Sequence, residues 1–293
     1  MRLLLLAAAT TSILISALIV YTLFKEAWHF LVLLSDESGL GALIDDGANP
    51  GWYPRNGRFD LPTIVIGTVL VSLVSIVVAA PLGLGAAVFL SEYASPRTRK
   101  WLKPILEVLA GVPSVVFGFF AVRVLGPDLI QPLFNTSQTT SLLVTGVAIG
   151  FLVTPLMASI SEDALRAVPT SLREASTGLG ARKSNTVLKV VLPAAVSGIV
   201  AALIISVSRA VGETMVAALA SGRLGQSPRT LDVRDPGLTM TAAMAQVATG
   251  SDQVVGSGPV FQSLFFVGAL LFLMTLALNM IANRIVGRFR NKY

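Results

Sequence analysis

The chain has 293 residues, of which 54% are apolar and only 13% are charged. Its mean hydropathy of +0.76 excludes a soluble globular domain, which needs more charge at its surface. The net charge of +6 does not indicate nucleic-acid binding because the cations are spread over several connecting segments, and the absence of cysteine excludes disulfides and thiolate metal sites.

Six apolar runs are each long enough to cross a hydrocarbon core of about 30 Å as an α-helix. They cover residues 3–24, 61–90, 105–125, 141–160, 194–220 and 260–282. The first run resembles a secretory signal, but it is longer than the roughly 7–15 apolar residues of a signal core, so we expect an uncleaved span. The sequence predicts an all-α membrane protein, a polytopic bundle of six transmembrane helices.

The charges of the connecting segments set the expected orientation. With the amino terminus inside, the inner segments hold 14 of the 22 Lys and Arg residues, the outer segments hold 5, and the spans hold Lys25, Arg123 and Arg209. An excess of Lys and Arg is typical of cytoplasmic loops, so both termini are expected in the cytoplasm. The expected regions are the first helix with an external loop (1–60), a membrane core (61–282) with a cytoplasmic loop (161–193), and a basic tail (283–293).

Two longer segments are expected outside. Residues 35–60 are rich in Gly, Asp and aromatic residues, and they form either a flexible link or a small amphipathic cap. Within residues 221–259, the stretch 239–244 is expected to form a short helix that lies on the outer surface.

Gly and Pro interrupt several spans. They occur at 81–85 in the second span, at 111–114 in the third and at Pro155 in the fourth, while Gly146 and Gly150 allow close helix approach. Each interruption taken alone fits ordinary packing. Together they predict helices that shift against one another.

The loop at 161–193 is polar, basic and broken by glycine. Ser171 and Glu174 have the spacing of a capping box, so a short helix is expected to begin there. Gly178 and Gly180 are expected to end it, and a second short helix begins near Lys183 and ends at Pro193. The residues alone leave two interpretations open: an ordinary capped turn, or a surface that another subunit contacts.

The spacing in this loop resembles the cytoplasmic loop of bacterial ABC importer permeases. That motif has Glu-Ala-Ala, Gly six residues after the Glu, and an apolar residue, any residue and Leu-Pro, which here correspond to Glu174, Ala175, Gly180, Val190, Leu192 and Pro193, with Ser176 in place of the second Ala. The resemblance implies a type I, MetI-like permease fold and a loop that docks on a separate ATPase subunit. The expected contact residues are Leu172, Glu174, Ala175, Gly178, Gly180, Leu192 and Pro193.

A phosphate-binding loop is the rival interpretation, because Arg182-Lys183-Ser184 is similar to the end of a P-loop. That motif needs Gly directly before the Lys, and the chain contains no Gly-Lys-Ser or Gly-Lys-Thr. We therefore expect no catalytic residue, cofactor or metal in this chain, and ATP with Mg²⁺ on the partner ATPase.

Arg209 and Glu213 are four residues apart in the fifth apolar run, which would place them on one helix face. Charges at the bilayer centre are costly, so such residues usually face the bundle interior. They form either a buried ion pair or a path for an oxyanion, which the planar guanidinium group of Arg fits. Arg123 is expected near the outer end of the third span, where it either reaches the headgroups or lines the path; Glu107, near the inner end, is similar.

These segments extend the resemblance to the phosphate-uptake ABC permeases over roughly residues 60–293. Residues 112–119 and 209–215, together with 90–94 and 166–169, resemble that family, and the Gly-Glu-Thr-Met ending is similar to its PstC subunits. The resemblance implies a path lined by Arg209, Glu213, Thr214 and Arg123. It also implies a PstA-like second permease, a PstB-like ATPase dimer, a PstS-like external phosphate-binding protein, and a multi-pass location in a bacterial inner membrane.

Three alternatives stay open. An ABC permease for molybdate or sulfate would carry the same loop. A gradient-driven secondary transporter would show internal inverted repeats, and the sequence shows no evident repeat. A regulatory membrane protein would signal phosphate status without carrying phosphate.

Overall fold

The computed structural model describes residues 1–293 except 38, 45–50, 137, 223–228, 250–257 and 291–293. Within the described residues, five helices are long and apolar enough to cross a membrane: Arg2–Asp36, Leu61–Tyr93, Ser114–Phe134, Leu142–Arg166 and Pro259–Arg284. A sixth span results if Lys183–Ala194 and Val196–Val211, which meet at a bend of 70°, are counted as one. The prediction of an all-α polytopic bundle is confirmed.

The long elements are helical from end to end. They are α1 (Arg2–Glu37), α2 (Leu61–Val88) with the π-helical turn η3 (Phe89–Tyr93), α6 (Leu142–Arg166), α10 (Val196–Val211) and α13 (Pro259–Arg290). The shorter ones are η1 (Leu40–Leu43), β1 (Trp52–Tyr53), η2 (Pro54–Asn56), β2 (Arg58–Phe59), α3 (Pro96–Ala110), α4 (Ser114–Phe120), the π-helical η4 (Ala121–Ile130), α5 (Gln131–Phe134), α7 (Thr170–Gly178), α8 (Lys183–Thr186), the π-helical η5 (Val187–Val191), α9 (Leu192–Ala194), α11 (Met215–Ala220) and α12 (Met240–Ala248).

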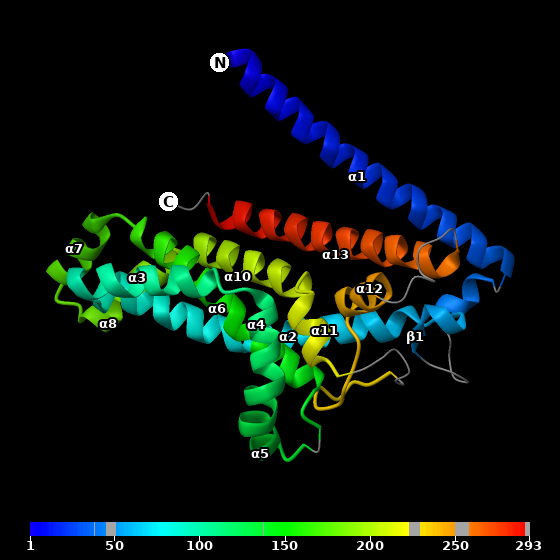
Figure 1. Ribbon diagram of the computed structural model, residues 1–293. Coiled ribbons are helices and arrows are strands. Elements are labelled where there is room, and N and C mark those ends of the chain that lie inside the picture. Colours follow the sequence, from blue (N-terminus) through cyan, green and yellow to red (C-terminus); the bar gives the residue numbers. More distant parts are fainter. Residues whose placement is uncertain (38, 45–50, 137, 223–228, 250–257, 291–293) are drawn as a thin grey trace.

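Helices α2, α6, α10 and α13 lie side by side along the long direction of the molecule, and α4 to α5 turn across it (Figure 1). Helix α1 contacts α13 through its carboxyl half, where Ala27, Phe30 and Leu34 are buried. The amino half of α1 diverges from the bundle (Figure 1) and exposes its apolar side chains.

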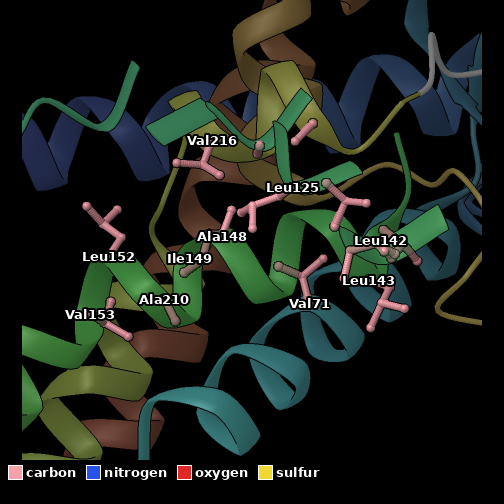
Figure 2. Packing of buried hydrophobic residues seen from close by; sticks show 14 of the residues in the cluster. Val71, Leu125, Leu142, Leu143, Ala148, Ile149, Leu152, Val153, Ala210 and Val216 are labelled. Atoms are coloured by element: carbon pink, nitrogen blue, oxygen red, sulfur yellow. The ribbon is translucent and has the colours of Figure 1, made fainter. Parts of the chain in front are cut away.

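The core lies where α6 crosses α2 and α10 (Figure 2). The backbones of α2 and α6 approach so closely that only glycine fits at two positions of α6. A Cβ atom at Gly146 would lie 2.5 Å from Val74, and one at Gly150 would lie 2.7 Å from Val78. The prediction that these two glycines permit close helix packing is confirmed.

The predicted interruptions divide into two kinds. Pro81 and Pro155 lie inside unbroken helices, so the expected breaks in the second and fourth spans are wrong. The predicted interruption of the third run is confirmed by a break after Gly111, whereas the fifth run breaks at Gly212, where no interruption was predicted. Composition alone does not decide the outcome, since Pro81, Gly83 and Gly85 lie in an unbroken helix; neighbouring helices compensate for a lost backbone hydrogen bond where the packing allows it.

The break after Gly111 moves the third span. The candidate span is Ser114–Phe134 and not 105–125, because α3 is amphipathic and buries none of its side chains. Glu107 therefore lies exposed on α3, outside the span, and Arg123 lies near the span's middle and not near its outer end. Both expected placements were wrong.

The described part of the first external segment is residues 35–37, 39–44 and 51–60, and within it residues 51–60 form a packed cap. Strands β1 and β2 pair antiparallel, and Trp52 and Phe59 are buried beside Phe30. Residues 45–50 of this predicted segment lie outside the described part of the chain.

In the second external segment, Thr239 caps α12 by accepting a hydrogen bond from the amide of Ala242 at 3.1 Å. The predicted short helix is therefore confirmed, but its expected place on the surface is wrong. Met240, Ala242 and Ala243 are at most 2% exposed, because α12 packs against α2, α11 and α13.

Candidate functional site

The cytoplasmic loop contains the two short helices that the sequence predicts, with a different start. Helix α7 begins at Thr170 behind Pro169, which has no capping side chain, so the Ser171–Glu174 capping box is wrong. Proline fixes φ close to the helical value at the residue before Thr170, and Ser171 is already within the first turn. Its hydroxyl therefore has no place at the cap.

The end of α7 follows the prediction for Gly180. This residue has a φ of +81° and donates to Thr177 O at 2.9 Å, while Ala181 N donates to Ser176 O at 3.1 Å. These two bonds form a Schellman motif, in which Gly accepts the left-handed conformation without strain. Gly178 is the last helical residue and has an ordinary negative φ, so only Gly180 supplies the left-handed residue.

The second helix of the loop is α8, η5 and α9, which run continuously over Lys183–Ala194 before the 70° bend into α10. Leu192 packs on a buried cluster that includes Ala87, Leu165 and Val191, and Pro193 is exposed. Thus Leu192 anchors the loop to the bundle, and the sequence correctly places the end of the second helix at Leu-Pro.

Helix α7 presents its predicted contact residues to solvent. None of its residues is buried; Glu174 and Ala175 are exposed, and Leu172 is 36% exposed. Leu179, just after the helix, is 90% exposed, although it is the kind of side chain that folding normally buries. This chain therefore leaves the apolar side chain at the end of α7 uncovered.

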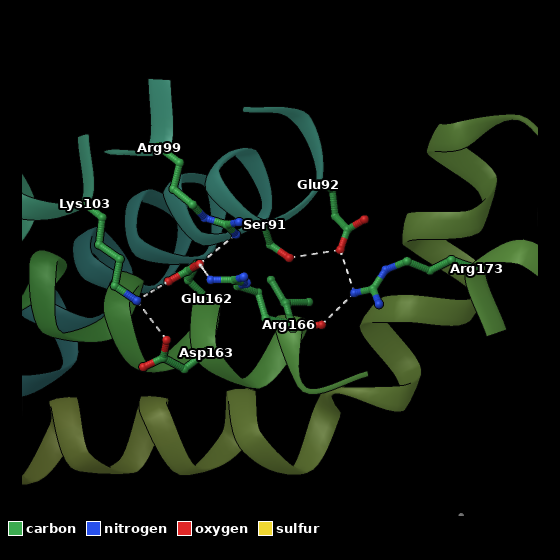
Figure 3. A network of polar contacts seen from close by, with 9 residues as sticks. Ser91, Glu92, Arg99, Lys103, Glu162, Asp163, Arg166 and Arg173 are labelled. Atoms are coloured by element: carbon green, nitrogen blue, oxygen red, sulfur yellow. Dashed lines mark hydrogen bonds and ion pairs between the residues drawn. The ribbon is translucent and has the colours of Figure 1, made fainter. Parts of the chain in front are cut away.

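A charged network, which the sequence analysis did not identify, fixes α3 to the inner end of α6 (Figure 3). Glu162 is 1% exposed and pairs with Arg99 at 2.8 Å and with Lys103 at 2.7 Å, and Lys103 also reaches Asp163 at 2.9 Å. Hydrogen bonds from Lys103 to Glu162 and then to Asp163 raise the pKa of this lysine above its ordinary value of 10.5. The position of Glu162, just after the fourth apolar run, is the feature of the sequence that could have indicated this network.

The fifth apolar run breaks at the residues that the sequence predicts to line a path. Helix α10 ends at Val211 and α11 begins at Met215, so Arg209 is in the last turn of α10 while Glu213 and Thr214 form the break. Placing Arg209 and Glu213 on one continuous helix face was therefore wrong, because Gly212 ends the helix between them.

The predicted ion pair between these residues is not formed either. Arg209 is exposed, Glu213 is 9% exposed, and neither forms an ion pair with any residue in the described part of the chain. Thr214 is half-buried, and its hydroxyl reaches Gly212 O at 3.3 Å.

Arg123 lies in η4, which packs beside α11, and its guanidinium group stands 5.5 Å from the centre of the Phe119 ring. Its side chain is exposed. The structure thus places Arg123 on an element next to the break, and a cation–π contact holds it. Within the described residues, Arg123 and Arg209 are not joined by a polar contact.

External elements support the break from outside. Thr241 of α12 donates to the backbone carbonyl of Glu213 at 2.9 Å. The loop before α12 is tied to the cap by Arg229 and the buried Asp60, whose carboxylate accepts at 2.7 Å and also holds Thr63. The external segments therefore fix the backbone at Glu213, although the side chain of Glu213 forms no hydrogen bond with a described residue.

Comparison with known proteins gives the same picture. A family model described as "Binding-protein-dependent transport system inner membrane component" matches residues 79–292. "Probable ABC transporter permease protein YqgH" of Bacillus subtilis (strain 168) is 33% identical over 202 residues, which is 66% of this chain and 65% of that protein. "Phosphate transport system permease protein PstC 1" of Mycobacterium tuberculosis is 30% identical over 257 residues, which is 80% of this chain and 75% of that protein.

Solved structures agree in fold. A bacterial alginate ABC transporter in complex with an alginate pentasaccharide-bound periplasmic protein has a TM-score of 0.63 at 14% identity, covering 96% of this chain and 94% of that one. The inward-facing MetNI methionine ABC transporter has a TM-score of 0.59 at 20% identity, covering 76% and 93%. The chain belongs to the family of binding-protein-dependent transport system inner membrane components, the permease subunits of ABC transporters.

Proposed function

We propose that this chain is the PstC-type permease of an ATP-driven importer of inorganic phosphate. The names of its relatives support phosphate as the substrate. The observation that carries the proposal is Arg209, a cation in an apolar helix that forms no ion pair with a described residue and lies beside a break in that helix. Such a guanidinium group is available to an oxyanion, which its planar fork fits.

The remaining path residues have distinct roles in this proposal. Thr214 offers a neutral hydroxyl at the break, and Arg123 offers a second cation on the neighbouring η4. Glu213 repels an anion that lingers beside Arg209, so it favours release over trapping. A PstA-like second permease supplies the other half of the pathway.

Two further kinds of partner complete the importer. A PstS-like external protein delivers phosphate, and a PstB-like ATPase dimer binds ATP and Mg²⁺ and contacts α7 through the exposed residues from Leu172 to Gly180. Permease relatives of this class are transport components, and the exposed tip at Leu179 supports the docking role. This chain contributes no catalytic residue.

The test is phosphate uptake by proteoliposomes that contain this chain with its partner subunits. Arg209→Gln keeps a polar, hydrogen-bonding side chain and removes its charge, and we expect it to lower the uptake rate roughly tenfold, equivalent to about 1.4 kcal/mol. Lys25→Gln is the matched control, because Lys25 is an exposed cation of α1. Equal uptake by Arg209→Gln and the wild type would show that Arg209 does not serve the path.

Another tetrahedral oxyanion is the second candidate substrate, since the same fork fits sulfate or molybdate. Excess sulfate or molybdate in the uptake assay separates these substrates from phosphate: competition by either one contradicts phosphate specificity. Uptake that survives ATP depletion would contradict the ATP-driven mechanism and favour a gradient-driven transporter. Unchanged uptake in cells without this chain would favour a regulatory role.

A further inference from the structure

Helix α7 buries no side chain in the bundle, so a few polar contacts determine its position. Arg173 makes most of them: it donates through Nη1 to Val168 O at 2.5 Å and through Nη2 to Leu165 O at 2.8 Å. Leu165 is in the last turn of α6 and Val168 lies two residues beyond the helix; carbonyl groups at this end lack intrahelical partners and favour a cation. Arg173 therefore pins α7 to α6.

The same guanidinium group reaches a third element. Its Nη2 atom lies 3.0 Å from Oε1 of Glu92, a residue of η3 at the inner end of α2, and the Glu92 side chain is only 9% exposed. Ser91 donates to the same oxygen at 2.9 Å. A buried carboxylate is stable only when it is paired, so the Arg173–Glu92 contact fixes α7 to α2 with a well-defined geometry.

The second helix of the loop contacts the next residue of η3. The Nζ atom of Lys183, the first residue of α8, stands 5.0 Å from the centre of the Tyr93 ring. Thus α7 and α8 contact consecutive residues, Glu92 and Tyr93, of one π-helical turn. Single π turns inside helices are frequent at functional sites.

Between these contacts and the bundle, the structure leaves space. A cleft of about 370 Å³ separates α2 from α8 and η5, and it is lined by residues that include Gly85, Val88 and Leu188. The loop helix still packs on α2 beside this cleft, because Leu192 joins the buried cluster of Ala87 and Val191. The loop therefore contacts α2 and its continuation η3 at two places: the apolar cluster around Leu192, and the polar contacts of Arg173 with Glu92 and of Lys183 with Tyr93, a residue that lines the cleft.

We propose that the Arg173–Glu92 ion pair, supported by Lys183 on Tyr93, is the joint that transmits movement of the cytoplasmic loop to α2. Arg173 and Glu92 are positioning residues in this proposal: they contact neither phosphate nor ATP. The proposal rests on the proposed function, in which an ATPase moves α7. It assigns a role to the segment around Leu90–Ala94, which the transport path and the docking surface leave without one.

A double-mutant cycle in the reconstituted complex tests the joint. Arg173→Gln, Glu92→Gln and the double variant are compared for co-purification of the ATPase and for phosphate transported per ATP hydrolysed. We expect the ATPase to remain bound in all three, and transport per ATP to fall roughly fivefold or more. The double variant should be no worse than either single variant, because one joint can be lost only once.

Arg97→Gln is the matched control, because Arg97 is exposed near the same end of the molecule and forms no ion pair with a described residue. It should transport as the wild type does. Additive losses in the double variant, or wild-type transport per ATP in the two single variants, would overturn the joint.

The test remains decisive even if one of the variants fails to fold. Glu92→Gln preserves the size of the side chain and the hydrogen bond from Ser91, so it decides the question alone if Arg173→Gln does not accumulate. Failure of the wild-type complex to import phosphate with ATP would instead contradict the proposed function. Wild-type import with unchanged import by Glu92→Gln would contradict the joint alone.

Discussion

The two ends of this molecule each contain a short connecting helix, α12 at the outer end and α7 at the inner end, and only the first of them is packed. At the outer end, the loop that follows Arg229 turns inward, and α12 buries Met240, Ala242 and Ala243. At the inner end, α7 has about the same length but buries nothing and exposes Leu179. The outer end is closed by contacts within the chain, whereas the inner end leaves a surface that a partner can cover.

The same contrast applies to the polar contacts. The outer end uses a buried carboxylate, Asp60, and a capping hydroxyl, Thr239, each within a packed environment. The inner end also contains a buried carboxylate, Glu162 of α6, but the groups that hold α7 itself are Arg173 on helix carbonyls and Gly180 in a Schellman turn, both nearer to solvent. We infer that the outer end contributes to stability and the inner end to coupling.

The largest expected effect comes from one substitution type at both ends. Leu238→Ala removes a side chain that is 2% exposed, so it should lower the free energy of unfolding by about 2–5 kcal/mol. Leu179→Ala removes one that is 90% exposed and should change this free energy by less than about 0.5 kcal/mol. Unfolding of both variants in detergent measures the two free energies. Equal losses of stability would contradict the difference between the packed outer end and the exposed inner end. Leu179→Ala should instead weaken ATPase binding, which a pull-down titration measures.

The next effect concerns the two glycines of the inner end. Gly180→Val forces a β-branched residue into a left-handed conformation, at a cost of about 1–2 kcal/mol, and should distort the Schellman turn. The expected result is reduced ATPase binding and transport with normal membrane insertion. Gly180→Asn is the control and not a change at Gly178, because Gly178 belongs to the same proposed contact segment and Asn adopts the left-handed conformation with little strain. If both variants lose transport equally, the left-handed turn is not the cause.

The third effect depends on pH. Burial by itself would raise the pKa of the Asp60 carboxyl, but hydrogen bonds from Arg229 and Thr63 outweigh burial and hold the pKa below its ordinary value of 3.8. A lowered pKa means that the carboxylate stabilises the fold above pH 3.8, and that this contribution is lost as pH falls through the folded-state pKa. Asp60→Asn should therefore destabilise the protein by about 1 kcal/mol at pH 7.

The stability difference between Asp60→Asn and the wild type should shrink below pH 3.8. Thermal unfolding at pH 7 and at pH 3 or lower measures it. A difference that stays constant over this range would contradict the assignment of the effect to the Asp60 charge.

The smallest expected effect tests the network on α6. Lys103→Gln should cost about 0.5 kcal/mol, because Lys103 is partly exposed and Arg99 and Arg166 still neutralise Glu162. Lys100→Gln should cost nothing measurable, since Lys100 is exposed and pairs with no described acid. Unfolding midpoints of the two variants give the comparison; a larger loss in Lys100→Gln would contradict it.

Most of the spans could be predicted from the sequence, but of the predicted interruptions only the one at 111–114 is a helix break, and the break at Gly212 was not predicted. A long apolar run is compatible with a helix throughout, so it does not show whether Pro113 or Pro155 ends the helix. The structure ends it before Pro113 and continues through Pro155 because packing decides which lost hydrogen bonds are tolerated. The four-residue spacing of Arg209 and Glu213 failed for the same reason, since that spacing assumes an unbroken helix.

The carboxyl ends of the two loop helices were predicted more successfully than the contacts that support these helices. Gly180 and the Leu192–Pro193 end depend on local backbone rules, which a sequence records directly. Contacts such as Arg99–Glu162 and Arg229–Asp60 join residues 63 and 169 positions apart. No local pattern marks such pairs, because the topology of the bundle brings them together.

The π-helical turn η5 lies between the docking loop and the bend into α10. A π turn contains one residue more than an α turn, and each residue of an α-helix accounts for about 100° of rotation and 1.5 Å of rise. Tightening this turn by one residue would rotate α8 about its axis by roughly a quarter of a circle, without unwinding either neighbour. The extra residue of η5 therefore lies at the point where a rotation of α8 relative to α10 would have to be accommodated.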